Sequence, residues 1–381
     1  MTISGAELES IVTALSEKLN RYYVLDGIAP KIASVLTDNL HRGVYAQHVD
    51  NPAQLAEVFT TDLRSVNGDK HLALRFQSTP LTEEPDVAKE FEEEQVDGDE
   101  SKWPPMMHAM AEMMKLCGGG FFSVRRLEGN VGYFDLHSLI LGKLTAERMI
   151  RAAFELVQYT NALIIDLRRC IGGAGESALL IESYLFEKKT DVTEIFWKPP
   201  NKKMIESTLD SVDGPKYLNK PVYILTSSST FSAAEALCVV LQAFGRAKVI
   251  GETTSGGGHP CTFVRAGHDH FQASISIGKT ICLASGKGWE GVGCIPDVQV
   301  SPLPGFVPGS STEQDLVLDT AYLAAARDTL SALQLEPDAD KSRGRRQLQV
   351  EAATTISKLE ARIQLSKGQS HTHLEAVTTT N

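Results

Sequence analysis

Apolar positions near the start of the chain repeat at the spacing of an amphipathic helix. One such face is formed by Leu8, Ile11, Val12, Leu15 and Leu19. Apolar residues three or four positions apart lie on one side of a helix. The pattern changes to strict alternation at residues 71–76, which is typical of a strand with one buried face. We therefore expect a helical N-terminal domain over residues 1–76.

From residue 129 onward, short apolar strands alternate with apolar helices. Strands are expected at residues 131–136, 162–167, 221–226 and 247–250. Helices are expected at about 145–159, at 232–244 and at about 314–333, with a further apolar helix that ends near Phe186. Strands that alternate with helices in this way predict a largely parallel sheet. We expect an α/β core over residues 129–305 and a C-terminal helix within 306–336.

Two segments differ from the rest in composition. Residues 83–100 hold ten acidic residues and one lysine. They lie in an expected linker, residues 77–128, which also contains a Met-rich helix at 106–114. A solvated loop or helix face is the simpler interpretation of the acidic run, and a docking site for a basic substrate is the alternative. Residues 337–381 are charged and are expected to form a tail.

Charge and cysteine content exclude several classes of protein. The chain has 381 residues and a net charge of −11, which argues against a nucleic-acid partner. No apolar run is long enough to span a membrane, and the first eight residues lack the pattern of a secretory signal. The six cysteines form no C-x-x-C pair, as expected for thiols of a reduced compartment. We expect a cytoplasmic protein.

Metal and cofactor motifs are weak in this sequence. There is no H-E-x-x-H segment, and His268 and His270 are expected to form a pair on a strand surface rather than a metal site. We therefore expect neither a metal nor a cofactor.

Chemistry-bearing residues gather in loops that follow predicted strands, where ligand sites of parallel sheets lie. Ser232 begins a predicted helix, where the helix dipole favours negative charge and the next backbone N–H can hold an oxyanion. Ser232 and Glu235 also match an S-x-x-E capping box, so a structural role is the alternative. Gly172 and Gly173 would let the backbone approach a ligand closely, or simply form a tight turn.

Four segments together resemble the tail-specific, or C-terminal processing, serine peptidase family. They are L-R-R-C-I-G-G at 167–173, F-S-A-A-E at 231–235, G-R-A-K-V-I-G-E-T-T-S-G-G-G at 245–258 and W-E-G-V-G-C-I-P-D at 289–297. The resemblance covers about residues 10–305 and is greatest to the branch that contains interphotoreceptor retinoid-binding protein modules. It implies a crotonase-like (ClpP-like) α/β core with a helical N-terminal domain. The sequence between His71 and Gly129 is too short for the PDZ domain of many members.

The resemblance also implies catalytic roles. Ser232 occupies the position of the nucleophile, and Gly257 stands where many members have a lysine base. The tricorn-type branch uses a histidine and a late glutamate instead, which His71 and Glu290 resemble; that branch has a serine where this chain has Lys70.

Two sets of residues complete this hypothesis. An oxyanion hole would be formed by the backbone N–H groups of Ala233 and of Gly172 or Gly173. The reserve candidates for the base are His259 and His137. The pH dependence of a histidine base is expected near its ordinary pKa of about 6.5.

Two functions follow from the resemblance. The leading hypothesis is a serine-type peptidase that cleaves a peptide or protein substrate through an acyl-enzyme. The alternative is a non-catalytic binder of apolar small molecules, such as retinoids or fatty acids. A catalytically silent scaffold that uses the acidic run is a third hypothesis.

Overall fold

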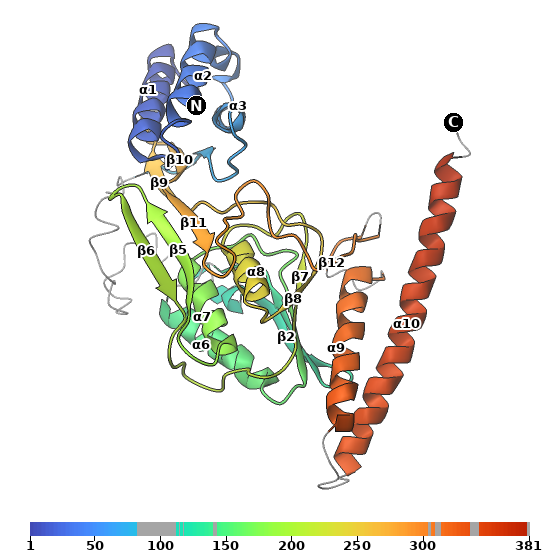
Figure 1. The fold of residues 1–381 in the computed structure, drawn as a ribbon. Helices are drawn as coiled ribbons and strands as arrows, with labels where there is room; N and C mark the ends of the chain where they lie inside the picture. Colours follow the sequence, from blue (N-terminus) through green and yellow to red (C-terminus); the bar gives the residue numbers. More distant parts are fainter. Residues whose placement is uncertain are drawn as a thin grey trace. The chain divides into compact units, whose positions relative to one another are not determined.

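The computed structural model describes residues 1–81, 112–113, 115–116, 118–139, 143–303, 306–308, 314–335 and 343–378 (Figure 1). The acidic run 83–100 and most of the Met-rich segment 106–114 lie outside these residues. The chain forms two compact units. Unit 1 comprises Met1–Asp97, Thr193–Glu206 and Gly256–Gly291, and unit 2 comprises Gly98–Val192, Ser207–Ser255 and Val292–Asn381.

Unit 1 combines the N-terminal helices with two small sheets. Its elements are α1 (Gly5–Tyr22), α2 (Ala29–His41), η1 (Tyr45–His48), α3 (Pro52–Arg64), β1 (Ala73–Phe76), most of β5 (Asp191–Trp197) and β6 (Lys202–Ser207), β9 (Cys261–Arg265), β10 (Phe271–Ser276) and β11 (Gly278–Cys282). The sheet orders are β1-β10-β9 and β11-β5-β6. The predicted apolar face of α1 is buried in the core of this unit.

Unit 2 is built on a six-stranded sheet with the order β12-β8-β7-β4-β3-β2. Its elements are η3 (Gly118–Gly120), β2 (Phe121–Leu127), β3 (Val131–Leu136), α6 (Lys143–Val157), β4 (Ala162–Asp166), α7 (Gly175–Leu185), β7 (Val222–Thr226), α8 (Ala233–Ala243), β8 (Lys248–Gly251), β12 (Val298–Gln299), α9 (Leu316–Leu335) and α10 (Arg343–Thr378). The pairs from β3 to β12 are parallel, and β2 runs antiparallel to β3. The predicted parallel sheet is therefore confirmed.

Strand residues of this sheet alternate between two buried layers. On β4, Leu163 and Ile165 join the core that α6, α7 and α8 close, whereas Ala162 and Ile164 join the core beneath α9. A strand buried on both faces reads as a continuous apolar run, which is why these strands could be predicted from the sequence.

Three features differ from the sequence analysis. The segment 129–305 is not one body, because 193–206 and 256–291 belong to unit 1, where β5, β9, β10 and β11 pair with antiparallel neighbours. The charged segment expected as a tail contains the helix α10, which packs on α9. His268 and His270 lie in the turn between β9 and β10 rather than on a strand, since Gly267 has a positive φ of 71°.

The described cysteines are unbridged, and no described helix is suited to span a membrane. The five cysteines among them, Cys170, Cys238, Cys261, Cys282 and Cys294, are free thiols. None of the described helices combines the length and the apolar character that crossing a bilayer requires.

Candidate active site

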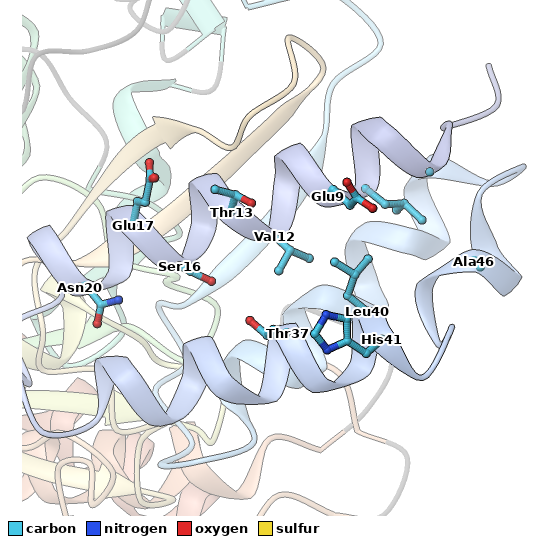
Figure 2. Close-up of a pocket in the computed structure, with 12 residues that line it drawn as sticks. Glu9, Val12, Thr13, Ser16, Glu17, Asn20, Thr37, Leu40, His41 and Ala46 are labelled. Carbon is cyan, nitrogen blue, oxygen red and sulfur yellow. The ribbon is translucent and has the colours of Figure 1, made fainter.

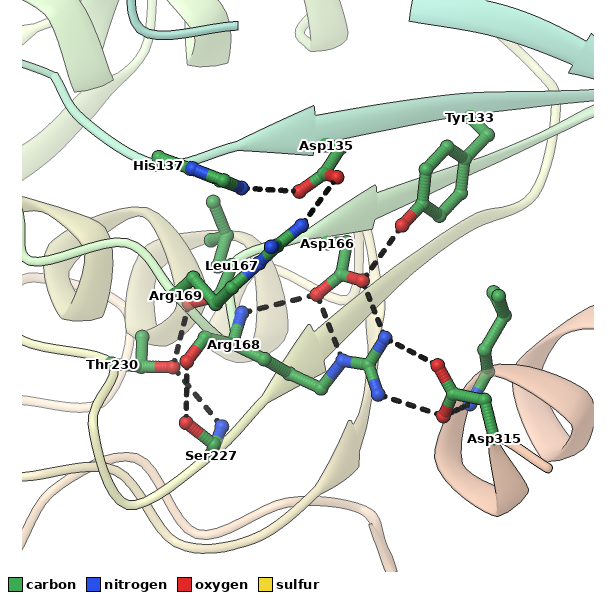
Figure 3. A network of polar contacts seen from close by, with 11 residues as sticks. Tyr133, Asp135, His137, Asp166, Leu167, Arg168, Arg169, Ser227, Thr230 and Asp315 are labelled. Carbon is green, nitrogen blue, oxygen red and sulfur yellow. Dashed lines mark hydrogen bonds and ion pairs between the residues drawn. The ribbon is translucent and has the colours of Figure 1, made fainter. Parts of the chain in front are cut away.

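In unit 2, two loops meet at the carboxyl edge of the parallel sheet. One follows β4 and the other follows β7. Ser227 Oγ donates a hydrogen bond to the Arg168 carbonyl (2.6 Å), and Thr230 Oγ1 donates to the Leu167 carbonyl (2.8 Å), as Figure 3 shows. The Phe231 N–H donates to the Cys170 carbonyl (3.1 Å). These bonds fix the loop before Ser232 against the loop that contains the two glycines.

Ser232 has a strained backbone at the start of α8. Its φ is +57° and its ψ is −126°, whereas an ordinary N-cap residue adopts an extended conformation with negative φ. Residues with side chains rarely occupy this region, and such strain collects at functional sites. The side chain is partly exposed. Helix capping alone does not require this conformation.

Gly172 packs directly against the nucleophile candidate. Its φ is +86°, and a Cβ placed on it would lie 2.6 Å from the Phe231 carbonyl oxygen, 2.8 Å from Ser232 Cβ and 2.9 Å from the Ala233 nitrogen. Only glycine fits this approach. The Ala233 N–H is the first amide of α8, and first-turn amides have no intrahelical acceptor. The structure thus brings Ser232, Ala233 and Gly172 together, with Gly173 next in the chain.

The capping box that the sequence predicts is present at the start of α8. Glu235 accepts a hydrogen bond from the Ser232 N–H (2.9 Å) and another from Thr254 Oγ1 (2.5 Å). Glu235 is fully buried, and it joins α8 to the loop that follows β8. The box therefore holds the strained turn in place and is compatible with either role of Ser232.

His71 lies in unit 1, just before β1, and its side chain is 8% exposed. Burial lowers the pKa of His71 to about 4, although the Asp69 carboxylate opposes the effect. The imidazole is therefore neutral over a wider pH range than its ordinary pKa implies.

Asp69 lies beside His71 and was not among the candidate residues predicted from the sequence. It is 1% exposed. Its carboxylate accepts hydrogen bonds from the His71 N–H (2.9 Å) and the Tyr23 hydroxyl (3.0 Å), and it lies 3.4 Å from Nδ1 of His259. Burial alone would raise its pKa, but the His259 contact and the His71 N–H bring the pKa below its usual value. A charged Asp69 thus anchors the backbone of His71.

Glu290 lies in the same cluster. One carboxylate oxygen of Asp69, one ring nitrogen of His71 and one carboxylate oxygen of Glu290 all lie within 4.8 Å of one another. One oxygen of Glu290 accepts hydrogen bonds from the backbone N–H groups of Gly258 (2.6 Å) and His259 (3.1 Å). Burial, followed by the charge of Asp69, raises the pKa of Glu290. The structure therefore brings His71 and Glu290 together, with the reserve candidate His259 beside them.

This spacing would also suit a metal ion. However, Asp69 and Glu290 already accept hydrogen bonds from Tyr23 and from backbone N–H groups, so the cluster is explained without one.

The other reserve candidate, His137, belongs to unit 2. Its Nε2 lies 2.9 Å from Oδ1 of Asp135, and its ring stacks on Phe122 (Figure 3 shows the ion pair).

Ser232 and His71 belong to different units.

A cavity of about 680 Å³ lies between α1 and α2 in unit 1. Figure 2 shows Val12, Ser16, Thr37 and Leu40 among its lining residues. It contains none of the residues for which the sequence predicts a catalytic role.

Comparison with known proteins identifies the family. The family model "Peptidase family S41" matches residues 130–300, and the model of the N-terminal domain of this peptidase in eukaryotic IRBP matches residues 5–115. The carboxy-terminal processing protease CtpA of Bacillus subtilis is 26% identical over 132 residues, 34% of this chain. The chain matches 27% of the length of that relative.

Among solved structures, the photosystem II D1 C-terminal processing protease has a TM-score of 0.47 and 16% identity, with 80% of this chain and 95% of that one covered. The tricorn protease has a TM-score of 0.41 and 14% identity, with 77% and 34% covered. The family assignment rests on the sequence matches, which together span well over half of the chain. The chain belongs to peptidase family S41, the C-terminal processing peptidase family that its motifs predict.

Proposed function

We propose that the protein is a serine-type peptidase in which Ser232 is the nucleophile, His71 the general base and Glu290 the residue that orients the base. The backbone N–H of Ala233 and one from Gly172 or Gly173 form the oxyanion hole. The substrate is a peptide or protein.

The observation that carries the proposal is the strained backbone of Ser232 with Gly172 packed against it. A sharp strand-to-helix turn with positive φ presents a serine hydroxyl away from the sheet, beside the first amides of the helix. Those amides and a glycine amide are suitable donors for the oxyanion of a tetrahedral intermediate. A serine needs a neighbouring base to become nucleophilic.

In the proposed mechanism His71 acts in its neutral form, which its lowered pKa favours. A neutral imidazole takes the Ser232 proton as the hydroxyl attacks the scissile carbonyl, and then gives it to the leaving amine. Water, activated by the same imidazole, hydrolyses the acyl-enzyme. Glu290 stabilises the transient imidazolium, and Asp69 holds the backbone of the histidine.

Hydrolysis of a quenched-fluorescent peptide library tests the proposal. The wild type should cleave library members, and Ser232→Ala and His71→Ala should each lower kcat/KM by at least about 10³-fold. A folded Ser232→Ala protein that keeps the wild-type rate would refute it.

A second candidate function is favoured by one observation, the match of residues 5–115 to the N-terminal domain found in eukaryotic IRBP. It is the binding of an apolar small molecule without catalysis. Saturable quenching of protein fluorescence by retinol or a fatty acid, in a protein that hydrolyses no library peptide, would favour this function over the first.

A further inference from the structure

A cluster of four side chains lies beside the glycine loop of unit 2, and the proposed chemistry does not use it. Asp135 accepts a hydrogen bond from Arg169 at 2.7 Å and lies 2.9 Å from the His137 ring. The Phe122 ring stacks on the His137 imidazole at 5.0 Å with an angle of 6° between the planes. The Arg169 guanidinium lies 5.3 Å from the centre of the Phe122 ring. Figure 3 shows Arg169 and His137 converging on Asp135.

This cluster is open to solvent, although its central carboxylate is not. The side chain of Asp135 is 7% exposed, whereas those of Arg169 and His137 are 28% and 30% exposed. Phe122 is 69% exposed, and Ile171 in the adjacent loop is 62% exposed. Both apolar side chains are therefore accessible to a ligand that binds beside the charged pair.

Backbone hydrogen bonds attach the cluster to the glycine loop. The Ile171 N–H donates to the His137 carbonyl (3.3 Å), and the Leu139 N–H donates to the Gly172 carbonyl (2.8 Å). Arg169 precedes Gly172 by three residues, so their Cα atoms are at most about 11 Å apart. An extended peptide covers that distance in about three residues.

The chemistry of the cluster indicates what it recognises. Arg169 has five N–H donors in a rigid fork. Among the described residues, its guanidinium donates a hydrogen bond to Asp135. The remaining donors suit a second carboxylate, while the faces of Phe122 and Ile171 suit an apolar side chain. A structural ion pair needs neither the exposed stacked ring nor the spare donors.

We propose that Arg169, with Phe122 and His137, is a substrate subsite that binds a carboxylate a few residues from the scissile bond. The inference rests on the proposed peptidase function. The carboxylate is either an acidic side chain or the C-terminus of the substrate. Asp135 orients Arg169 and His137 for this contact.

The test uses one quenched-fluorescent peptide in three forms: a free C-terminal carboxylate, a C-terminal amide, and the amide with one glutamine replaced by glutamate. The wild type should have a kcat/KM roughly tenfold or more higher for a carboxylate form than for the plain amide, the effect of one charge-assisted hydrogen bond. The form that shows the gain identifies the source of the carboxylate. Arg169→Gln should lower this ratio to about one, mainly by raising KM for the carboxylate form.

Arg151→Gln is the matched control, because Arg151 is also a part-exposed arginine of unit 2 that pairs with an aspartate. It should keep the wild-type ratio. Arg169→Lys, which retains the charge but not the fork, should keep part of it and serves if Arg169→Gln does not fold. A wild type without any preference, or an Arg169→Gln protein that keeps it, would overturn the subsite and leave the peptidase proposal standing.

Binding to Ser232→Ala separates the two failures. If the wild type hydrolyses none of the peptides, the peptidase proposal fails. Fluorescence anisotropy with the three peptides on Ser232→Ala then still tests the subsite, since a carboxylate form should bind roughly tenfold more tightly than the amide. Equal affinities for all three forms would refute it.

Discussion

At the scale of single residues, two groups are held in conditions that do not favour stability. Ser232 occupies a backbone conformation that residues with a side chain rarely adopt. His71 is buried without its charge, although an exposed histidine would be better solvated. The strained turn suits a nucleophile, and the uncharged imidazole suits a general base.

The strain at Ser232 can be measured by substitution. Glycine adopts positive φ without a penalty, whereas alanine does not. We expect Ser232→Gly to be more stable than Ser232→Ala by about 1–3 kcal/mol, and both to lack activity. Urea unfolding of the two variants measures this difference, and equal stabilities would show that Ser232 is not strained.

The pH dependence of activity reports on His71. Only the neutral imidazole can accept the serine proton, so activity is lost as pH falls through the pKa. Because burial lowers that pKa to about 4, we expect kcat/KM to stay level from about pH 8 to pH 5 and to fall below it. An acid limb at pH 6–7, which the ordinary pKa of histidine implies, would mean that His71 is not buried as described or is not the base.

At the scale of elements, the strand–loop–helix segments of unit 2 position Ser232, the proposed nucleophile. β4 and β7 end at the same edge of the sheet because they are parallel neighbours. Their loops are joined by hydrogen bonds from Ser227, Thr230 and Phe231. At Gly172 this arrangement leaves no room for a side chain.

A pair of glycine substitutions tests this close contact. Gly172 and Gly245 both have positive φ, but a Cβ on Gly245 would meet nothing within 4 Å. Gly245→Ala should therefore lose only the conformational term, about 1 kcal/mol, and keep its activity. Gly172→Ala should lose more stability and nearly all activity, measured by thermal unfolding and peptide hydrolysis. Equal effects of the two substitutions would contradict the contact.

The same elements show what could be predicted from the sequence. Strands β3, β4, β7 and β8 were predictable because they are largely apolar on both faces, and the loop motifs placed Ser232 and the glycines after such strands. The role of Asp69 was not predictable, because its partner His259 is 190 residues away and no local pattern marks the contact. The strands of residues 261–282 were also missed. They follow one another without intervening helices, so the strand–helix alternation that marked the parallel sheet is absent there.

At the scale of the whole molecule, a buried ion network joins the sheet of unit 2 to α9. The guanidinium of Arg168 contacts Asp166 at the end of β4 (2.6 Å) and Asp315 just before α9 (2.8 Å), and Tyr133 donates to Asp166 (2.8 Å), as Figure 3 shows. Arg168 and Asp166 are 3% and 4% exposed at the side chain. This network lies directly before the glycine loop.

Removing the cation from this network should destabilise unit 2. Arg168→Met leaves Asp166 buried without its partner, and breaking a buried ion pair in this way costs roughly 3–5 kcal/mol. The double variant Asp166→Asn with Arg168→Met should recover part of this loss. Urea unfolding measures both. If Arg168→Met is as stable as the wild type, the network does not hold α9 to the sheet.

The central claim is that Ser232 is a nucleophile activated by His71, and covalent labelling tests it most directly. A fluorophosphonate probe should add one label to the wild type, located on Ser232 by peptide mass spectrometry. Ser232→Ala should not be labelled, and His71→Ala should react at least about 10³-fold more slowly. A wild type that never labels, or a His71→Ala protein that labels at the wild-type rate, would contradict the account.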